Sequence, residues 1–301
     1  MLRGPDSHSE RFLNDMAQLT RRMNRAERQL SSGRRINAPS DAPSEIANLL
    51  SARSELGRLQ QGHSNLGRVK TEVDTGEQAL QHAVETLDRA LVLGAQGATT
   101  VATAESRKTL AAEVGTLLGR LVGLSASQVE GRFLFSGDND QVEPYTLDLA
   151  AANPVGAYAG ASTTRLVGHP SGTRFAIART AQQIFDSSDP ASNVFQSVNR
   201  LRTALDGNDL GAIQSAIANV KTASSYLGDQ LSHYGTIQNQ VAEAIEFSST
   251  QQLRLKIRLS EIEDADLTEA ATELTTTRFL QQTAFAAEAK RPRTSLFDYL
   301  G

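Results

Sequence analysis

An unbroken stripe of apolar residues, spaced alternately three and four positions apart, constrains the fold of this chain more than any other feature. The stripe runs from Leu49 to Gly94 and takes in fourteen positions, eleven of which are apolar. Such spacing brings one narrow face of an α-helix against a partner helix. A helix of about 50 residues is about 75 Å long. The stripe therefore predicts an elongated helical bundle rather than a compact globule.

The same spacing recurs on both sides of this helix. Four further stripes, the last of them weaker, lie at residues 12–30, 110–124, 227–262 and 267–284. Gly33, Pro39 and Pro43 separate the first helix from the second, because glycine tolerates the left-handed conformation at a helix end and proline cannot continue a helix. The residues from Asp206 to Asp209 are typical of a turn and predict a short helix on each side.

The pattern changes between residues 131 and 190, which are rich in Gly, Pro, Asn and Asp. Arg132–Phe135 and Thr173–Ile177 are short β-prone stretches, and His169–Gly172 is a plausible turn between strands. We therefore predict a mainly α fold, α+β overall. Both chain ends form an elongated helical bundle or coiled-coil rod, and a small β-rich insert lies at its tip.

This organisation divides the chain into five segments. The insert lies in the middle, one half of the helical rod lies on each side of it, and a terminal helix lies at each end. The predicted segments are 1–35, 36–130, 131–190, 191–264 and 265–301. Isolated helices as short as the two terminal ones are marginally stable in water. We therefore expect the two terminal segments to be largely disordered in the free monomer and to become ordered when they pack against other subunits.

Composition excludes several classes of function. The net charge is −4 and the pI is about 5.8, so neither nucleic acid nor an anionic membrane is an expected partner. The chain has no Cys, which excludes thiolate catalysis, disulfides and cysteine metal sites. The chain has no run of 18 apolar residues, so no membrane-spanning helix is predicted. The first ten residues lack the apolar core of a cleaved signal peptide.

Candidates for chemistry are few. His63 lies within the long stripe and could act as a base or a metal ligand, but its position favours a packed or interface histidine. Asp138 and Asp140 suggest a calcium loop, but the glycine and glutamate that such a loop needs are missing, which favours a turn. The acidic cluster from Glu261 to Asp266 could serve acid–base catalysis. A solvated patch or a helix cap accounts for it more simply. We predict no catalytic, cofactor or metal site.

Two terminal motifs carry a family resemblance that spans nearly the whole chain. Leu30–Asn37 resembles the amino-terminal signature of the bacterial flagellin family. Leu259–Leu267, followed by Leu280-Gln281-Gln282, resembles the carboxyl-terminal signature, and Glu77–Leu80 matches the second helix of the family. The resemblance implies a structural component of the bacterial flagellum and not an enzyme.

The family includes filament subunits and hook-associated subunits at the junction of hook and filament. Ala38–Pro43 resembles the Pro-Ser-Asp-Asp-Pro form of the hook-associated members, although Ala42 replaces the second Asp. Gly131–Gly137 resembles their entry into the middle domain, so the resemblance favours the junction. The alternatives are a filament flagellin and, more remotely, a cytoplasmic helical adaptor. Leu91 stands where flagellins recognised by an innate immune receptor carry Arg, so that recognition is not expected here.

The resemblance also implies a mechanism, namely self-assembly into a tubular layer through the terminal helices. The implied interface consists of Phe12, Met16, Leu19, Met23 and Leu30, faced by Leu267, Leu274, Leu280 and Phe285. The implied partners are other copies of the chain, other hook-associated proteins, flagellin and an export chaperone on the carboxyl-terminal region. No nucleic acid, membrane, cofactor or metal is expected. The implied location is the flagellum, reached by export without a cleaved signal peptide.

Overall fold

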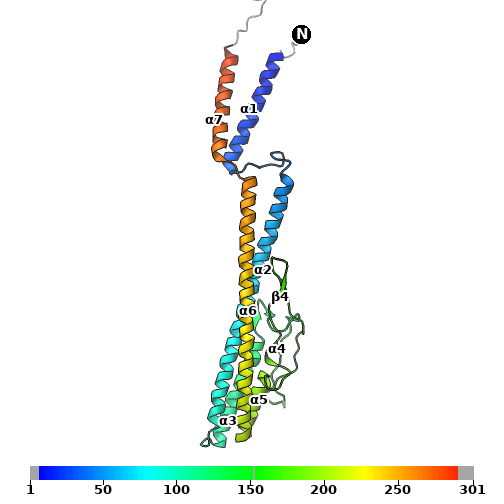
Figure 1. The fold of residues 1–301 in the computed structure, drawn as a ribbon, viewed down its shortest axis with the longest axis vertical. Helices are drawn as coiled ribbons and strands as arrows, with labels where there is room; N and C mark the ends of the chain where they lie inside the picture. The colour runs from blue at the N-terminus through cyan, green and yellow to red at the C-terminus, as the bar shows by residue number, and fades with distance from the viewer. Residues whose placement is uncertain (1–6, 152, 291–301) are drawn as a thin grey trace, which may run out of the picture. The chain divides into compact units, whose positions relative to one another are not determined.

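The computed structural model describes residues 7–151 and 153–290, and most of these residues are helical (Figure 1). They form two compact units. The first unit consists of residues 7–58 and 251–290, and the second of residues 59–250. Two long helices, α2 (Ile46–Gly97) and α6 (Leu210–Glu263), contribute to both units. The predicted mainly α class with a small β insert is confirmed.

The first unit contains α1 (Ser7–Ser32), the beginning of α2, the end of α6, and α7 (Leu267–Ala289). The amino-terminal stripe lies on α1 and the carboxyl-terminal stripe on α7. Gly33 ends α1 with a φ of +70°, a conformation that glycine adopts without strain. The N–H of Gly33 donates to the carbonyl of Gln29 at 2.9 Å, which closes the last turn of α1.

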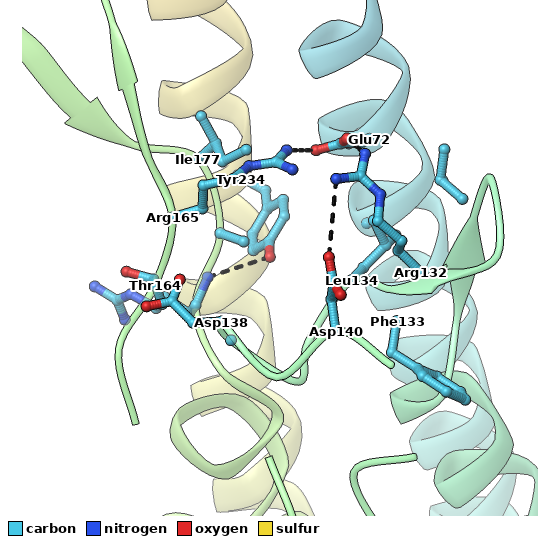
Figure 2. A pocket seen from close by; sticks show the side chains of 15 residues that line it. Glu72, Arg132, Phe133, Leu134, Asp138, Asp140, Thr164, Arg165, Ile177 and Tyr234 are labelled. Atoms are coloured by element: carbon cyan, nitrogen blue, oxygen red, sulfur yellow. Dashed lines mark hydrogen bonds and ion pairs between the residues drawn. The ribbon is translucent and has the colours of Figure 1, made fainter. Parts of the chain in front are cut away.

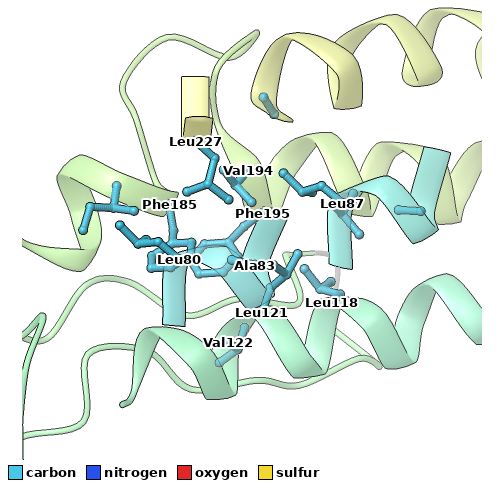
Figure 3. Packing of buried hydrophobic residues seen from close by; sticks show 14 of the residues in the cluster. Leu80, Ala83, Leu87, Leu118, Leu121, Val122, Phe185, Val194, Phe195 and Leu227 are labelled. Atoms are coloured by element: carbon cyan, nitrogen blue, oxygen red, sulfur yellow. The ribbon is translucent and has the colours of Figure 1, made fainter. Parts of the chain in front are cut away.

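The second unit is built on α2 and α6, joined by α3 (Ala104–Ser125) and α5 (Val194–Asp206). Gly76 and Gly94 of α2 lie against Tyr234 and Ile217 of α6, respectively, so the two helices run antiparallel. Leucines and small residues of α2 and α3 pack against aromatic side chains from the insert and α5 (Figure 3). The best-buried large side chains of this core include Leu80, Leu87, Leu118, Leu121, Phe185 and Leu201.

The predicted turn at residues 206–209 is confirmed, but one of its flanking helices is much longer than expected. After the turn, the Asp209 carboxylate accepts a hydrogen bond from the N–H of Ala212 at 3.0 Å and caps α6. Helix α6 then continues for 54 residues to Glu263. The expectation of a short helix was wrong because residues 212–227 contain neither Gly nor Pro, so the helix continues into the stripe that begins at Leu227.

Two small antiparallel sheets and one short helix lie in the insert, apart from strand β1, which lies just before residue 131. Strands β1 (Gln128–Val129) and β2 (Arg132–Phe133) pair with each other, and β3 (Leu166–Gly168) pairs with β4 (Arg174–Ala176). The predicted turn His169–Gly172 joins β3 to β4, where the N–H of His169 donates to the carbonyl of Thr173 at 2.7 Å. Helix α4 (Ala181–Phe185) begins with a capping box. Most of the remaining insert has no regular secondary structure.

The insert lies along the sides of α2 and α6, which corrects its expected place at the tip (Figure 1). Phe135 packs edge-on against Tyr234 of α6 with ring centroids 6.2 Å apart. His169 in the β3–β4 turn lies over Phe247, 5.4 Å away. Docking on the helices buries Phe135 and Tyr145 of the insert completely. An insert placed beyond the helix ends would leave these aromatic surfaces in water.

A buried carboxylate fixes the insert to α2 (Figure 2). The Glu72 side chain is only 10% exposed, and it accepts hydrogen bonds from Arg132 of β2 at 2.8 Å and from Arg165, which precedes β3. Arg132 also lies 3.8 Å from Asp140. Burial lowers the pKa of Arg165, but a guanidinium stays charged at neutral pH. Glu72 therefore joins two separate segments of the insert to one helix.

Candidate assembly interface

Helices α1 and α7 lie side by side in the first unit and form a thin apolar seam. Only Met16 and Ala26 of α1 and Ala270 and Thr277 of α7 are buried in the described parts of these helices. The rings of Phe12 and Phe285 meet edge to face with centroids 6.2 Å apart. A seam this narrow buries much less apolar area than the core of the second unit.

Two ion pairs flank the seam, one on each side. The Arg22 guanidinium donates to Glu273 at 2.7 Å, and Arg278 donates to Glu27 at 2.8 Å. The hydrogen bond from Arg22 lowers the pKa of the Glu273 carboxyl, and the positive charge of Arg22 adds to this effect. All four side chains are substantially exposed, so these pairs fix the register of the two helices more than they stabilise them.

A short bridge of backbone hydrogen bonds joins the segment after α1 to the segment before α7. The N–H of Arg35 donates to the carbonyl of Glu263 at 2.7 Å, and the N–H of Ala265 donates to the carbonyl of Gly33 at 2.9 Å. These bonds form an antiparallel bridge between Arg34 and Asp264. The two terminal signatures therefore meet in space.

The junction is also closed by buried polar and apolar contacts. The Glu263 side chain is 10% exposed and lies between the guanidinium groups of Arg34, at 3.0 Å, and Arg53. Arg35 donates to the carbonyl of Ile262 at 2.7 Å and to the carboxylate of Glu45. A small apolar cluster lies beside them, formed by Ile36, Ala42, Leu49, Ala52 and Leu259.

The Pro-Ser-Asp stretch has a local structural role in this junction. The Asp41 carboxylate accepts hydrogen bonds from the N–H groups of Asn37 at 3.0 Å and Ala38 at 2.8 Å. The backbone bond from Ala38 is the main reason why the pKa of Asp41 is lowered. Ala42 is 8% exposed, so it belongs to the apolar cluster. An aspartate at that position would be buried there without a partner in the cluster.

The acidic cluster before α7 divides into two kinds of residue. Asp266 caps α7 by accepting hydrogen bonds from the N–H groups of Thr268 at 2.8 Å and Glu269 at 3.0 Å. The predicted capping role is therefore confirmed for Asp266. Glu263 instead is buried and paired. Sequence reasoning missed this because the neighbouring acidic residues made the whole cluster look solvated.

The nine residues expected at an assembly interface differ widely in exposure. Met16 is buried, whereas Phe12, Leu19, Met23, Leu30 and Leu274 are half-buried. Leu267, Leu280 and Phe285 are 51%, 39% and 54% exposed. The structure brings Phe12 and Phe285 together within one chain. The role of these nine residues in assembly stays a prediction.

Two large apolar side chains of the same helices were missed. Leu13 of α1 is 62% exposed and Phe279 of α7 is 63% exposed. Both lie off the three-four stripe that identified the seam. A search for a second apolar face on each terminal helix would have found them.

The described residues contain no cluster of three or more acidic or histidine side chains that could hold a metal ion. Asp138 accepts a hydrogen bond from Thr163 at 2.7 Å within the insert. His63 is half-buried in α2, and within residues 7–151 and 153–290 its Nδ1 atom has no hydrogen-bond partner. No helix of the described chain is apolar enough over a sufficient length to span a membrane.

Comparison with known proteins agrees with the arrangement of the two ends. Residues 8–140 match the bacterial flagellin N-terminal helical region, and residues 210–300 match the bacterial flagellin C-terminal helical region. Flagellin FlaB1 of Treponema pallidum is 24% identical over 278 residues, which are 90% of each chain.

Solved structures show the same fold. FlgL from Bacillus cereus matches with a TM-score of 0.57 and 20% identity, over 71% of this chain and 100% of that one. The flagellar hook-associated protein-3 from Legionella pneumophila matches with a TM-score of 0.61 and 15% identity, over 70% of this chain and 98% of that one. With both terminal regions matched in the expected order and joined in space, the chain belongs to the bacterial flagellin family.

Proposed function

We propose that this chain is a structural subunit of the bacterial flagellum that assembles through its terminal helices into a tubular layer joining the hook to the filament. The observation that carries the proposal is the unfinished apolar surface of α1 and α7. Leu13, Leu267, Phe279 and Phe285 are each more than half exposed. The family relationship and the likeness to hook-associated folds support the same role, which is structural and not enzymatic.

The exposed apolar side chains of α1 and α7 favour association with neighbouring subunits. Completing the burial of a half-exposed Leu or Phe contributes about 1 kcal/mol. Four such side chains on one pair of helices therefore favour association by several times the thermal energy. The proposed contacts are heterologous, since repeated head-to-tail contacts build rings and tubes whereas two-fold contacts close into dimers.

The proposal extends to the state of the chain before assembly. Within the segments 1–35 and 265–301, the described residues 7–35 and 265–290 are proposed to be largely disordered in the free monomer and to become ordered against neighbouring subunits; the rest of the two segments lies outside the described residues. A chain in this state can pass unfolded through a narrow export channel, and an export chaperone can cover the exposed face of α7 beforehand. Hydrogen exchange of the dilute monomer tests this state. Slow exchange throughout α1 and α7 would contradict it.

The test of function compares two variants, each with a Leu→Gln substitution at one exposed leucine. Leu280→Gln places an amide on α7, and Leu166→Gln makes the same change in the insert, where the side chain is 57% exposed. Each variant is produced in cells that lack the native chain, and flagella are labelled with gold-coupled antibody. We expect label at the hook–filament joint for the native chain and Leu166→Gln only. Normal incorporation of Leu280→Gln would refute the proposed interface.

A second candidate function is that of the filament subunit. It is favoured by the match to a flagellin over 90% of both chains. The same labelling experiment separates the two roles. A junction subunit is confined to a short zone at the end of the hook, whereas a filament subunit is labelled along the whole filament.

A further inference from the structure

We infer that an arginine stripe on the outward side of α1 docks against the acidic residues that surround the start of α7 in a second copy of the chain. The arginine stripe consists of Arg21, Arg25 and Arg28. The acidic segment consists of Glu261, Asp264, Asp266 and Glu269. The inference rests on the proposed function, and it adds that charge selects which side-by-side contact the subunits make.

The arginine stripe faces away from the seam. Its members are spaced four and three residues apart, so they share one side of α1. Met23 and Ala26 of the seam lie on the opposite side, at 100° per residue. All three arginines are exposed. None forms an ion pair with a carboxylate within 4.0 Å in the described part of the chain, although the charges of Arg25 and Arg28 contribute to the lowered pKa of Asp41.

Other arginines of the first unit behave differently. Arg22, Arg34 and Arg53 each have a carboxylate partner within the chain. The chain thus pairs the arginines that hold its own helices together, whereas the outward ones form no such pair among the described residues. Guanidinium groups recognise carboxylates with good geometry, so an acidic partner suits the stripe.

The acidic segment offers the complementary charge. Its four carboxylates fall within nine residues, and no Lys or Arg lies among them. All four residues are exposed. Asp264 accepts a hydrogen bond from Ser260, and Asp266 caps α7, yet each carboxylate has a second oxygen for an incoming guanidinium.

The two surfaces come to one level of the terminal helix pair at Arg28 and Glu269. The hydrogen bond from Ala265 to the carbonyl of Gly33 places the end of α1 beside the start of α7. Arg28 precedes Gly33 by five residues, which is about one and a half turns. Glu269 follows Ala265 by four residues, so subunits that stand side by side at equal height would bring the Arg28 end of the stripe of one copy to Glu269 of the next. A surface that carries both charges can repeat around a ring.

Charge substitution tests the inference in the full-length chain. Arg21→Gln, Arg25→Gln and Arg28→Gln are combined in one variant, and the corresponding three Lys substitutions form the matched control. Each exposed pair shifts the association equilibrium about twofold, so losing three reduces incorporation into flagella about tenfold. The Lys variant should be incorporated normally, because it keeps the charge. Equal incorporation of the Gln and Lys variants would overturn the inference.

Reversal of both charges gives a sharper result. Replacing the three arginines by Glu should abolish incorporation, and adding Glu261→Arg and Glu269→Arg to the same chain should restore it. Failure of this restoration would count against direct pairing. Absence of the native chain from flagella would overturn the proposed function as well, whereas normal incorporation of the Gln variant overturns only the inference.

Crosslinking identifies the contact itself. The chain has no Cys, so Arg28→Cys and Glu269→Cys introduce the only two thiols. A short bis-maleimide should join these thiols between subunits in isolated flagella and produce a ladder of multiples of the monomer mass. The monomer in dilute solution serves as the control and should give no ladder. Reaction only within single chains would refute the contact between copies.

Discussion

The Glu72 cluster allows a quantitative prediction about how the insert is held. Glu72→Gln keeps the shape of the side chain but removes the charge that faces Arg132 and Arg165. Breaking a fully buried ion pair costs about 3–5 kcal/mol. Here the two arginine side chains are 35% and 40% exposed, so water recovers part of that loss. We expect the second unit to be destabilised by about 2 kcal/mol.

The measurement is urea unfolding followed by circular dichroism, together with hydrogen exchange of the β3–β4 hairpin. For a unit of this size, thermal unfolding should show the same loss of about 2 kcal/mol as a melting temperature about 4–8 °C lower. Exchange should accelerate more in the insert than in α3, because the insert loses its attachment first.

The control is Glu85→Gln on the same helix, where the carboxylate is 69% exposed. This change should alter the unfolding free energy by less than about 0.5 kcal/mol. If Glu72→Gln shifted the midpoint no more than Glu85→Gln, the carboxylate would not hold the insert. The anchoring role of the contacts in Figure 2 would then be wrong.

Three further predictions concern the core and the titrating groups. Leu87→Ala removes a fully buried side chain and should cost about 3 kcal/mol in urea unfolding; a cost below about 1 kcal/mol would contradict the packing in Figure 3. The pKa of Glu273 is lowered by Arg22, so their contact stabilises the α1–α7 pair above the ordinary carboxyl pKa and is lost as the pH falls below it. Hydrogen exchange in α7 of assembled subunits, corrected for intrinsic rates, should therefore accelerate below about pH 4, and an unchanged rate would exclude this contribution. Burial raises the pKa values of Tyr145 and Tyr234, so ultraviolet titration should ionise them only as helical circular dichroism is lost above about pH 10; ionisation with the helices intact would refute their burial.

The helices were predictable because their sequence signal is local and repeated. The stripe from Leu49 to Gly94 lies on α2, and Gly33 ends α1 as its backbone freedom suggests. The turn at 206–209 was equally visible, because turn residues interrupt the apolar spacing. The length of α6 was less predictable, since nothing in the turn at 206–209 limits how far the next helix extends.

The position of the insert could not be predicted from the sequence. It depends on Glu72 meeting arginines 60 and 93 residues later, and no local pattern links them. Its strands are two or three residues long, which is too short for an alternating pattern to identify. The apolar stripes predicted which sides of α1 and α7 face each other, but they missed Leu13 and Phe279, which lie outside the stripes. The burial of Glu263 was hidden because its partners, Arg34 and Arg53, lie more than 200 residues away.

The bridge between Gly33 and Ala265 has a consequence for the order of events during synthesis. Helix α1 is made first, yet the groups that complete its junction belong to residues about 230 positions later. Until those residues are available, Arg34 and Arg35 have no Glu263 to contact. In a chain that is truncated before these residues, the segment after α1 therefore cannot form the bridge at any time. The junction therefore forms only in a subunit that has both ends. A formed junction shows that translation has reached the carboxyl-terminal region.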